Sequence, residues 1–420
     1  MVSTSSTSPI GTRTKQLSVL KFGGTSVKSV PRIQHVAEIA QKRLKDGPLI
    51  IVVSAMGDTT DYLLKLAKQC ASNPDKRELD SLLSTGEQIS ITLLSIVLQS
   101  MGVRAKSFTA SQVGIFTESV FSKARIVDLK TDALQKSLLN TDVLIVAGFQ
   151  GITPEGDITT LGRGGSDTTA VALAAAMDAE VCDIFTDVDG IYTADPNSIR
   201  NARLLKEISY EEVLEMARLG AQVIHPRAVE LGRQYGVKLR VRNTFKPDHE
   251  GTIIHGGDKV EIYRTVSGVA VDKDQARVAI MDVPDQPGVA GKIARAMADK
   301  NIVIDMIMQA VHPSLGLNNV TFTVHETDLD ETKKVLQELK VKLNAGEVLA
   351  DSDIAKVSLI GAGMVGQPGV AAKFFEVLGG ANINIKMIGS SEMKLTCVVS
   401  KEQASEAARL IHDAFELHKA

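Results

Sequence analysis

Hydrophobic and polar positions follow two alternating periods along the first part of the chain. Short runs of Val, Ile and Leu, such as Leu49–Val53, alternate with segments that repeat apolar residues every three or four positions. Continuous apolar strands need both faces covered, and strands that alternate with helices form parallel sheets. The pattern therefore predicts an α/β fold, a three-layer αβα sandwich. The predicted strands are 17–22, 49–53, 105–108, 143–146, 181–186 and 237–241, and the predicted helices are 32–45, one from 59, one over 89–99 and 167–177.

An internal repeat follows a turn-rich stretch that ends near Lys259. Gln286–Lys292 matches Gln367–Lys373, and Asn301–Ile307 matches Asn382–Ile388. Each copy is expected to run strand, Pro-Gly turn, helix, strand, strand, helix, which is a ferredoxin-like order. In the first copy the predicted elements are 278–281, 288–299, 302–308, 319–324 and 329–339.

Composition excludes several classes of protein. The 420 residues exceed one ordinary core, and 47 Lys and Arg against 50 Asp and Glu leave a net charge of −3, so no broad basic face for nucleic acid is expected. The three cysteines are scattered, which favours a reducing cytoplasm, and the eight histidines lack HxxxH or HExxH spacing, so no metal centre is expected. The longest wholly apolar stretch, Ala170–Met177, is too short to span a membrane. Residues 1–16 are expected to be a disordered tail, with a truncated transit-like peptide as the alternative.

Two glycine-rich clusters could carry chemistry, and the first follows directly on a predicted strand, at the edge where open α/β sheets bind ligands. Lys21-Phe-Gly-Gly-Thr-Ser26 could cradle a phosphate through its backbone amides and its lysine, or could be only a turn. Leu161-Gly-Arg-Gly-Gly-Ser-Asp-Thr168 opens into a helix, whose free N–H groups and Arg163 suit an anion. Asp167 could cap that helix or organise cationic groups around a phosphoryl group, and spacing alone leaves both roles open.

Three further polar segments offer weaker signals. Thr186-Asp-Val-Asp-Gly-Ile-Tyr-Thr-Ala-Asp-Pro196 suits a nucleotide rim, although it could be an acidic turn with Tyr192 in the core. Ser54–Thr60 follows a strand. Thr85–Gln88 is expected to start a helix, where Glu87 could face the helix dipole or, if buried, could grip an ammonium group.

The Pro-Gly turns of the repeat each open a helix and so offer a seat for a carboxylate, although Pro and Gly could simply mark the turn. The duplication and its polar residues favour ligand sensing. The polar residues concerned are Asp285, Asp305, Gln309 and Asn384.

The three motifs and the C-terminal repeat together resemble aspartokinases, members of the amino-acid-kinase superfamily with tandem ACT domains. The resemblance extends from Leu17 to the C-terminus. It implies ATP-dependent phosphorylation of the β-carboxylate of L-aspartate to 4-phospho-L-aspartate, with Mg²⁺ bound mainly through ATP. It also implies four segments: a tail (1–16), a catalytic domain (17–260), a first ACT domain (275–345) and a second ACT domain (264–274 with 346–420).

The resemblance also implies roles for individual residues. Lys21, Asp167 and Arg163 would be catalytic, with Asp167 organising charge rather than accepting a proton. The nucleotide would contact Lys21, Phe22, Gly23, Gly24, Thr186, Asp187, Tyr192, Asp195, Pro196 and Asn197. L-Aspartate would contact Ser54, Thr60, Glu87, Arg163, Gly164, Gly165 and Ser166. Lysine or threonine, as feedback inhibitors, would contact Asp285, Gly288, Ala290, Asp305, Gln309, Asn384 and Ile385.

Packing between ACT domains would make the protein a homo-oligomer, with no nucleic-acid or membrane partner. One departure concerns Gln222, where some family members carry a lysine; that lysine's role is missing or is supplied elsewhere, for example by Lys206. Two rival interpretations stay open at this stage. One is a different amino-acid or UMP kinase with acquired sensors, and the other is a catalytically inactive ACT sensor.

Overall fold

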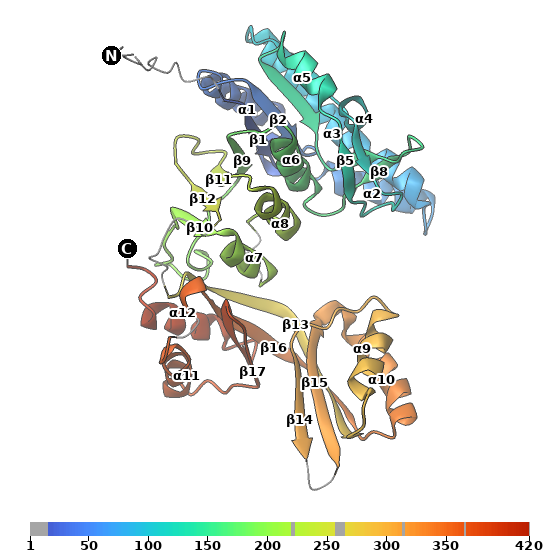
Figure 1. Ribbon diagram of the computed structural model, residues 1–420, viewed down its shortest axis with the longest axis vertical. Helices are drawn as coiled ribbons and strands as arrows, with labels where there is room; N and C mark the ends of the chain where they lie inside the picture. The colour runs from blue at the N-terminus through green and yellow to red at the C-terminus, as the bar shows by residue number, and fades with distance from the viewer. Residues whose placement is uncertain (1–15, 220–222, 257–264, 313–315, 365–366, 420) are drawn as a thin grey trace, which may run out of the picture. The chain divides into compact units, whose positions relative to one another are not determined.

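The computed structural model describes residues 16–219, 223–256, 265–312, 316–364 and 367–419 (Figure 1). The chain forms two compact units. Unit 1 comprises Met1–Ile191, Leu205–Tyr210 and Val223–Asp258, and unit 2 comprises Tyr192–Leu204, Glu211–Gln222 and Lys259–Ala420. The expected tail, the expected boundary near Lys259 and Gln222 all lie outside the described residues.

Unit 1 is built on an eight-stranded sheet with the order β10-β12-β11-β9-β1-β2-β6-β3. Six of its strands correspond to the predicted apolar runs, and their pairings are parallel, as continuous Val and Ile runs predict. The strands are β1 (Ser18–Phe22), β2 (Leu49–Val53), β3 (Ala105–Phe108), β6 (Val143–Ala147), β9 (Val181–Thr186), β10 (Glu207–Ser209), β11 (Leu239–Asn243) and β12 (Thr252–His255).

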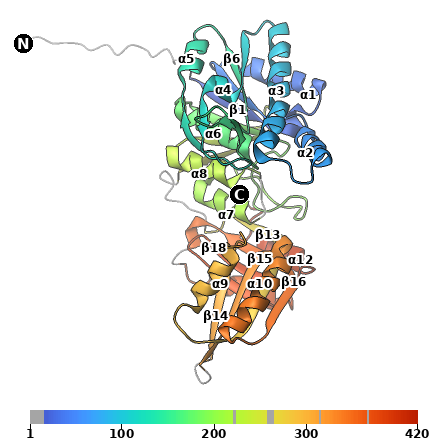
Figure 2. The ribbon, with the colours of Figure 1, turned by 90° about the vertical axis from the view of Figure 1, so that its right-hand side faces the viewer.

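Helices cover both faces of this sheet, which confirms the three-layer sandwich (Figure 2). On one face, α1 (Val30–Arg43) and α3 (Lys76–Ser100) bury Leu20, Ile51 and their neighbours in a continuous apolar core. On the other face, α6 (Gly165–Ala176) packs on β1, β2 and β9, and α8 (Pro226–Tyr235) packs on α6. Because side chains alternate along a strand, Lys21 of β1 lies on the α6 face, opposite to Leu20 and Phe22.

Helix α3 differs from the prediction in length. It begins at Lys76, where the Asp75 carboxylate accepts hydrogen bonds from the first backbone amides, and it runs for 25 residues. Thr85–Gln88 therefore lies in mid-helix, so the expectation that a helix starts there is wrong. By length and composition α3 could cross a membrane, but half of its apolar window is buried inside the protein and it packs on β2, β3 and β6. It is a core helix of unit 1.

A second, four-stranded sheet in unit 1 was not predicted. Its order is β5-β4-β7-β8, and its strands have only three or four residues each, too few for a periodic signal. The strands are β4 (Ile115–Thr117), β5 (Ile126–Leu129), β7 (Gln150–Ile152) and β8 (Ile158–Thr160). The short helices α4 (Ala110–Val113) and α5 (Asp132–Leu138), together with α2 (Thr59–Cys70), complete the helices of unit 1.

Unit 2 contains one six-stranded antiparallel sheet with the order β14-β15-β13-β16-β18-β17. Its two central strands are long and pair along most of their length, so that the repeated copies share them. The strands are β13 (Gly268–Pro284), β14 (Ile307–His312), β15 (Leu317–His325), β16 (Val348–Ile360), β17 (Met387–Ser390) and β18 (Lys394–Val399). The first half of β13 pairs with the second half of β16, next to β18.

Each repeated copy buries its own helices on the sheet. In the first copy, α9 (Val289–Ala298) and α10 (Leu329–Leu343) form a core with Val278 and Phe322. In the second, α11 (Val370–Gly380) and α12 (Ala404–Ala414) do the same with Val357. Two predicted ferredoxin-like units are therefore confirmed. Helix α7 (Tyr210–Arg218) precedes them in the chain.

One strand of the first copy is displaced from its predicted position. The strand predicted over residues 302–308 is observed over Ile307–His312. Asn301 has a φ of 57°, and Ile302 then enters the apolar core under α9 without joining a strand ladder. Apolar alternation in this segment therefore reflects burial rather than strand pairing.

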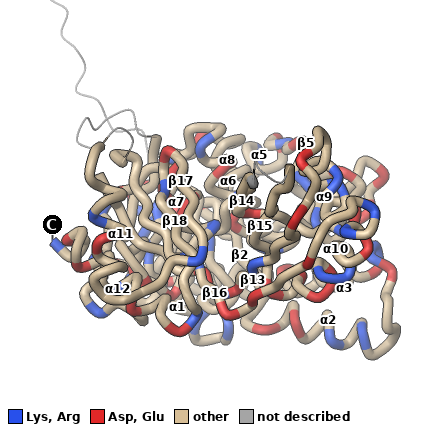
Figure 3. The backbone as a smooth tube through the Cα atoms, turned by 90° about the horizontal axis from the view of Figure 1, so that it is seen from below, with Lys and Arg blue, Asp and Glu red and all other residues tan. Residues whose placement is uncertain are grey.

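Charged residues of both signs are interspersed along the elements (Figure 3). This distribution agrees with the near-zero net charge of the sequence.

Candidate functional site

An ion pair joins the first two sequence clusters in unit 1. Lys21 Nζ, on β1, lies 2.6 Å from Asp167 Oδ1, in the first turn of α6, and both side chains are nearly buried. Burying either charge alone would be costly, so each holds the other in place. The loops after β1 and before α6 thus meet at the carboxyl end of β1, as the strand order requires.

The start of α6 is shaped by glycine. Gly164 has a φ of 67°, and a Cβ atom there would lie 2.1 Å from the ring of His225. Gly164 is also the N-cap residue, and no side chain among the described residues caps the helix. Asp167 stands three residues inside the helix and pairs with Lys21, so its alternative role as the N-cap is wrong. The first amides of α6 carry no side-chain cap and are suited to an anion.

His225 is a neighbour of this site that the sequence did not single out. Its backbone N–H lies 3.4 Å from Asp167 Oδ2, and its side chain caps α8 by accepting from Arg227 N. Burial lowers the pKa of His225. The sequence signal that could have identified it is a histidine placed directly before the proline that begins a helix.

The loops after β1 and β2 lie against each other. A Cβ on Gly24 would lie 3.0 Å from the carbonyl oxygen of Ala55, and Gly57 N donates to Gly24 O at 3.1 Å. This close approach brings the Lys21 loop next to the loop that begins at Ser54. The ring of Phe22 is fully buried and stacks on Phe185 at 4.6 Å, and its carbonyl oxygen accepts from Ser54 N at 3.1 Å.

Glu87 projects from the middle of α3 toward the Ser54 loop. Its Oε1 accepts from Ala55 N at 3.1 Å, while Oε2 is buried without a hydrogen-bond partner among the described residues. Burial raises the pKa of Glu87 to about 8, and the bond from Ala55 opposes that shift. Glu87 is the twelfth residue of α3, too far from the N-terminus of the helix to interact with the helix dipole. The predicted dipole role is therefore wrong. A buried carboxyl group with an unused oxygen can bind an ammonium group, whose positive charge favours the ionised form.

Arg163 lies in the loop between β8 and α6. It is exposed and makes no hydrogen bond or ion pair with any described residue. Its guanidinium is therefore available to a ligand carboxylate or phosphate. Gly165 and Ser166 are buried in the first turn of α6, and Thr60 stands in the first turn of α2.

The third cluster is divided between the units. In unit 1, Thr186 Oγ1 donates to Asp187 at 3.2 Å. In unit 2, the Asp195 carboxylate accepts bonds from Asn197 and Ser198 and so closes its own Asp-Pro-Asn-Ser turn. Tyr192 forms an isolated β-bridge with Leu204. The nucleotide contacts of these residues stay a prediction.

Asp80 is a second buried carboxylate of α3 that the sequence did not indicate. It is fully buried and accepts hydrogen bonds from Thr160 N, Thr160 Oγ1 and Ser122 N at 2.7, 2.8 and 2.8 Å. Seven residues apart, Asp80 and Glu87 share one face of the helix. Asp80 therefore fixes the start of the Arg163 loop against the helix that carries Glu87.

Four of the predicted effector residues line one cavity in the first copy of the repeat. The cavity has a volume of about 220 Å³, and its lining includes Asp285, Gly288, Ala290 and Gln309. Asn318, also in the lining, donates to Asp285 Oδ1 at 2.9 Å, while its own Oδ1 is buried without a hydrogen-bond partner among the described residues. The cavity thus offers a carboxylate, the side-chain amides of Gln286, Gln309 and Asn318, and the N-terminus of α9.

The other three predicted effector residues lie elsewhere. Asp305 forms an ion pair with the fully buried Lys356 and lines a different cavity of about 210 Å³. Asn384 is exposed before β17, and Ile385 packs against the apolar core of the second copy. Asp305, Asn384 and Ile385 are therefore not brought together with the other four by the fold of one chain.

Family models match both parts of the chain. The amino acid kinase family model matches residues 16–243, and ACT domain models match residues 277–343 and 357–415. The sandwich with its paired Lys21 and Asp167 and the two ferredoxin-like copies are thus those of an amino-acid kinase carrying ACT domains.

Relatives narrow this class. An aspartokinase from Bacillus sp. (strain MGA3) is 47% identical over 402 residues, which cover 96% of this chain and 97% of that protein. The crystal structure of E. coli aspartokinase III in complex with aspartate and ADP (R-state) has a TM-score of 0.78 at 27% identity, covering 95% and 99% of the two chains. That of the same enzyme in complex with lysine and aspartate (T-state) gives 0.76 at 26%, covering 94% and 99%.

The chain belongs to the aspartokinase family. It is an ATP-using aspartate kinase with ACT regulatory domains, as the resemblance implied. The alternatives of another amino-acid or UMP kinase and of an inactive sensor are thereby excluded.

The raised pKa of Glu87 predicts a pH-dependent cost to stability. Between about 4.5 and 8 the folded chain holds a proton that the unfolded chain has released, so stability falls as pH rises. The fall is at most about 1.4 kcal/mol per pH unit. Glu87→Gln removes this dependence, so its denaturation midpoint should rise relative to the parent's between pH 5 and pH 8. A midpoint difference that stays constant with pH would contradict the assignment.

Asp80→Asn tests the positioning of the Arg163 loop. An amide nitrogen cannot accept a hydrogen bond, so one of the donors on Thr160 or Ser122 loses its partner. The KM for aspartate should rise about tenfold, equivalent to about 1.4 kcal/mol, with a smaller change in kcat. Steady-state kinetics at saturating ATP measure both. Asp157→Asn is the control. It removes a partly exposed partner of Arg77, which lies on α3 as Asp80 does, and it should leave the KM for aspartate unchanged.

Proposed function

We propose that Lys21, Asp167, Arg163 and Glu87 form the centre that transfers phosphate from ATP to the β-carboxylate of L-aspartate, giving 4-phospho-L-aspartate. The ion pair between Lys21 and Asp167 is the observation that supports this proposal most directly. It sets one fixed cation at the carboxyl end of β1, next to the uncapped start of α6.

The chemistry needs positioning and charge neutralisation rather than a base. A carboxylate acceptor is already ionised near pH 7, and phosphoryl transfer proceeds largely by alignment and electrostatic stabilisation. We assign the aspartate α-carboxylate to Arg163 and the α-ammonium group to Glu87. The exposed guanidinium and the unused carboxylate oxygen support these assignments. Ser54, Thr60 and the segment Gly164–Ser166 would surround the rest of the substrate.

The ATP phosphates would lie on Lys21, Gly23 and Gly24. Thr186 and Asp187 of the same unit would contact the nucleoside. Magnesium fits this site as an ion carried by ATP, because the Asp167 carboxylate beside the phosphate loop is already paired with Lys21. Mg²⁺ commonly keeps waters and substrate phosphates as its main ligands. When bound, it would neutralise phosphate charge.

We propose that the 220 Å³ cavity of the first copy binds the feedback inhibitor, lysine and/or threonine. An effector's ammonium group would pair with Asp285, and its carboxylate would face the amides at the start of α9. Gln309 would hydrogen-bond to either group. The complex of E. coli aspartokinase III with lysine and aspartate supports lysine as the first effector to test.

Homo-oligomerisation through the ACT domains is part of the same proposal. The edge strands β14 and β17 end the six-stranded sheet, and edge strands present unpaired backbone groups to other chains. The apolar side chains Ile307, Met308 and Ile388 on these edges are exposed in the single chain. Contact between two copies would let one effector bias two catalytic units together.

An inhibition panel tests the effector assignment. Aspartate-dependent ADP release is measured with lysine, threonine and methionine, each alone and in pairs. Inhibition by lysine or threonine, alone or together, is the expected result. Inhibition by neither, with turnover intact, would refute the effector proposal and leave the kinase assignment standing.

Lys21→Ala should lower turnover at least about 100-fold, since it removes the fixed cation and leaves Asp167 buried without its partner. Effector binding to the cavity of unit 2 should persist, as measured by isothermal titration with lysine. Lys42→Ala, an exposed lysine on α1, is the matched control and should keep full turnover. Retained kcat in Lys21→Ala would remove Lys21 from the phosphate site.

Gln309→Ala should weaken feedback inhibition without lowering uninhibited activity. Loss of one hydrogen-bonding side chain from the cavity should raise the half-inhibitory lysine concentration about tenfold, equivalent to about 1.4 kcal/mol. Inhibition curves measure this shift, and Gln337→Ala, an exposed glutamine on α10, should not produce it. Unchanged curves for Gln309→Ala would refute the assignment of the cavity.

A further inference from the structure

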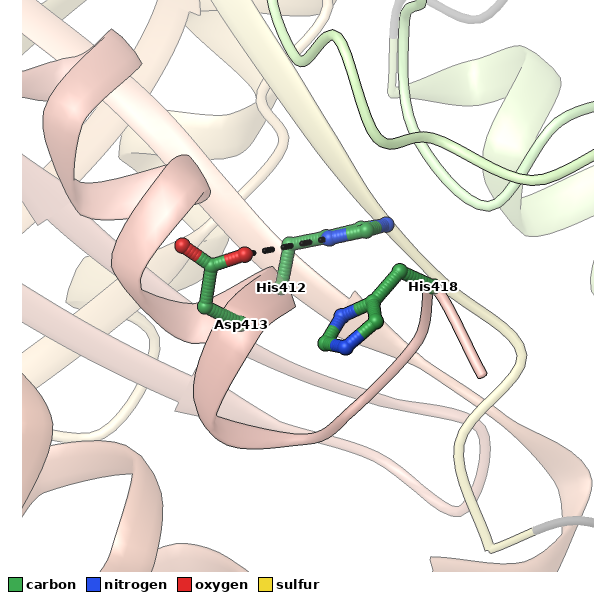
Figure 4. A group of neighbouring side chains, drawn as sticks. All are labelled: His412, Asp413 and His418. Atoms are coloured by element: carbon green, nitrogen blue, oxygen red, sulfur yellow. Dashed lines mark ion pairs between the residues drawn. The ribbon is translucent and has the colours of Figure 1, made fainter. Parts of the chain in front are cut away.

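A cluster of potential metal ligands lies at the C-terminal end of unit 2, outside the kinase and effector sites. His412 and Asp413 belong to the last turn of α12, and His418 follows in the turn after it (Figure 4). Each side chain offers one ligand atom, and the three atoms lie within 4.8 Å of one another. Their spacing of one and six residues matches none of the histidine patterns sought in the sequence.

The imidazole of His412 carries the main evidence for a ligand. The residue is fully buried, and its Nε2 lies 2.9 Å from Thr193 Oγ1. Its Nδ1 is also buried and has no hydrogen-bond partner among the described residues, because Asp413 Oδ1 is 3.9 Å away. Buried polar atoms are nearly always satisfied, so this nitrogen needs an explanation.

The hydrogen bond to Thr193 suits a metal-binding tautomer. The Thr193 hydroxyl oxygen accepts from Arg203 N at 2.9 Å and has a second lone pair for His412 Nε2–H. In that tautomer, Nδ1 presents its lone pair to the cluster. Histidine ligands typically donate their other ring N–H to a fixed acceptor of this kind.

The other two side chains differ in how firmly neighbouring residues hold them. Asp413 is oriented by Asn201, which donates to Oδ1 at 2.9 Å, and by Arg409, which donates to Oδ2 at 3.1 Å. His418 is exposed, so its ring can rotate toward the other two and leaves a path for an ion from solvent. Rotation is needed because ligand atoms at 2.0–2.1 Å from a tetrahedral ion lie about 3.4 Å apart.

We propose that His412 Nδ1, Asp413 Oδ1 and one ring nitrogen of His418 bind a single divalent ion of the zinc class. Two imidazoles and one carboxylate suit Zn²⁺, Co²⁺ or Ni²⁺, whereas Mg²⁺ prefers oxygen ligands. Water would complete the coordination. The ion would fasten the turn after α12 to the helix and, through Thr193 and Asn201, to the segment Tyr192–Leu204 of the same unit.

Zinc titration of the full chain tests the proposal. The chain carries no affinity tag and contains Cys70→Ser, because the exposed Cys70 thiol could itself bind zinc. Isothermal titration with Zn²⁺ should give one ion per chain with micromolar or tighter affinity, and Mg²⁺ should give no signal there. Zinc should also raise the thermal midpoint, because it binds the folded state.

His418→Ala identifies the site. Because His418 is exposed, the variant should fold with the parent's thermal midpoint in the absence of zinc. Its zinc affinity should fall at least about tenfold, because loss of a residue that only supports a ligand already costs that much. Zinc should also no longer raise its thermal midpoint. His325→Ala, an exposed histidine elsewhere in the unit, should bind zinc as the parent does. Parent-like affinity in His418→Ala, or no micromolar zinc binding by the parent, would overturn the proposal.

Discussion

The nearly buried ion pair of Lys21 and Asp167 is the constraint on which the catalytic unit depends. It connects the end of a central strand to the first turn of the helix on the opposite layer. A nearly buried lysine and aspartate are stable only when their charges are paired with each other. The pair therefore fixes the two glycine-rich loops relative to each other. Glu87 is positioned by its hydrogen bond from Ala55 N, and the loop that carries Arg163 is positioned by the hydrogen bond from Thr160 N to Asp80.

Sequence patterns identified the parts of this site that depend on local chemistry. Apolar runs located the six parallel strands. A strand end located the Lys21 loop, and a glycine-rich helix start located the Asp167 loop. Glycines with special backbone requirements, such as Gly164 and Gly24, stood in the motifs because neighbouring groups leave no room for a Cβ. The internal repeat likewise predicted two ferredoxin-like units. These features depend on nearest neighbours along the chain.

Features that depend on distant partners could not be predicted in this way. The partners of Asp80 lie 42 and 80 residues away, and nothing in its own helix distinguishes it from a surface acid. The four-stranded sheet was missed because its strands are too short to show a period. Asp305 was grouped with the effector residues by its position in the repeat, but the fold pairs it with Lys356.

The two repeated copies share the strands β13 and β16 but carry opposite charges at equivalent positions. Asp305 and Lys386 hold equivalent positions in the two copies, and each pairs with a residue of β16: Asp305 with Lys356, and Lys386 with Asp351 at 2.9 Å. Exchange of the copies would place like charges together at both points. The inverted pair thus distinguishes two otherwise similar halves. Strand β16 also runs through both halves, so each ion pair anchors its own copy to the same continuous strand.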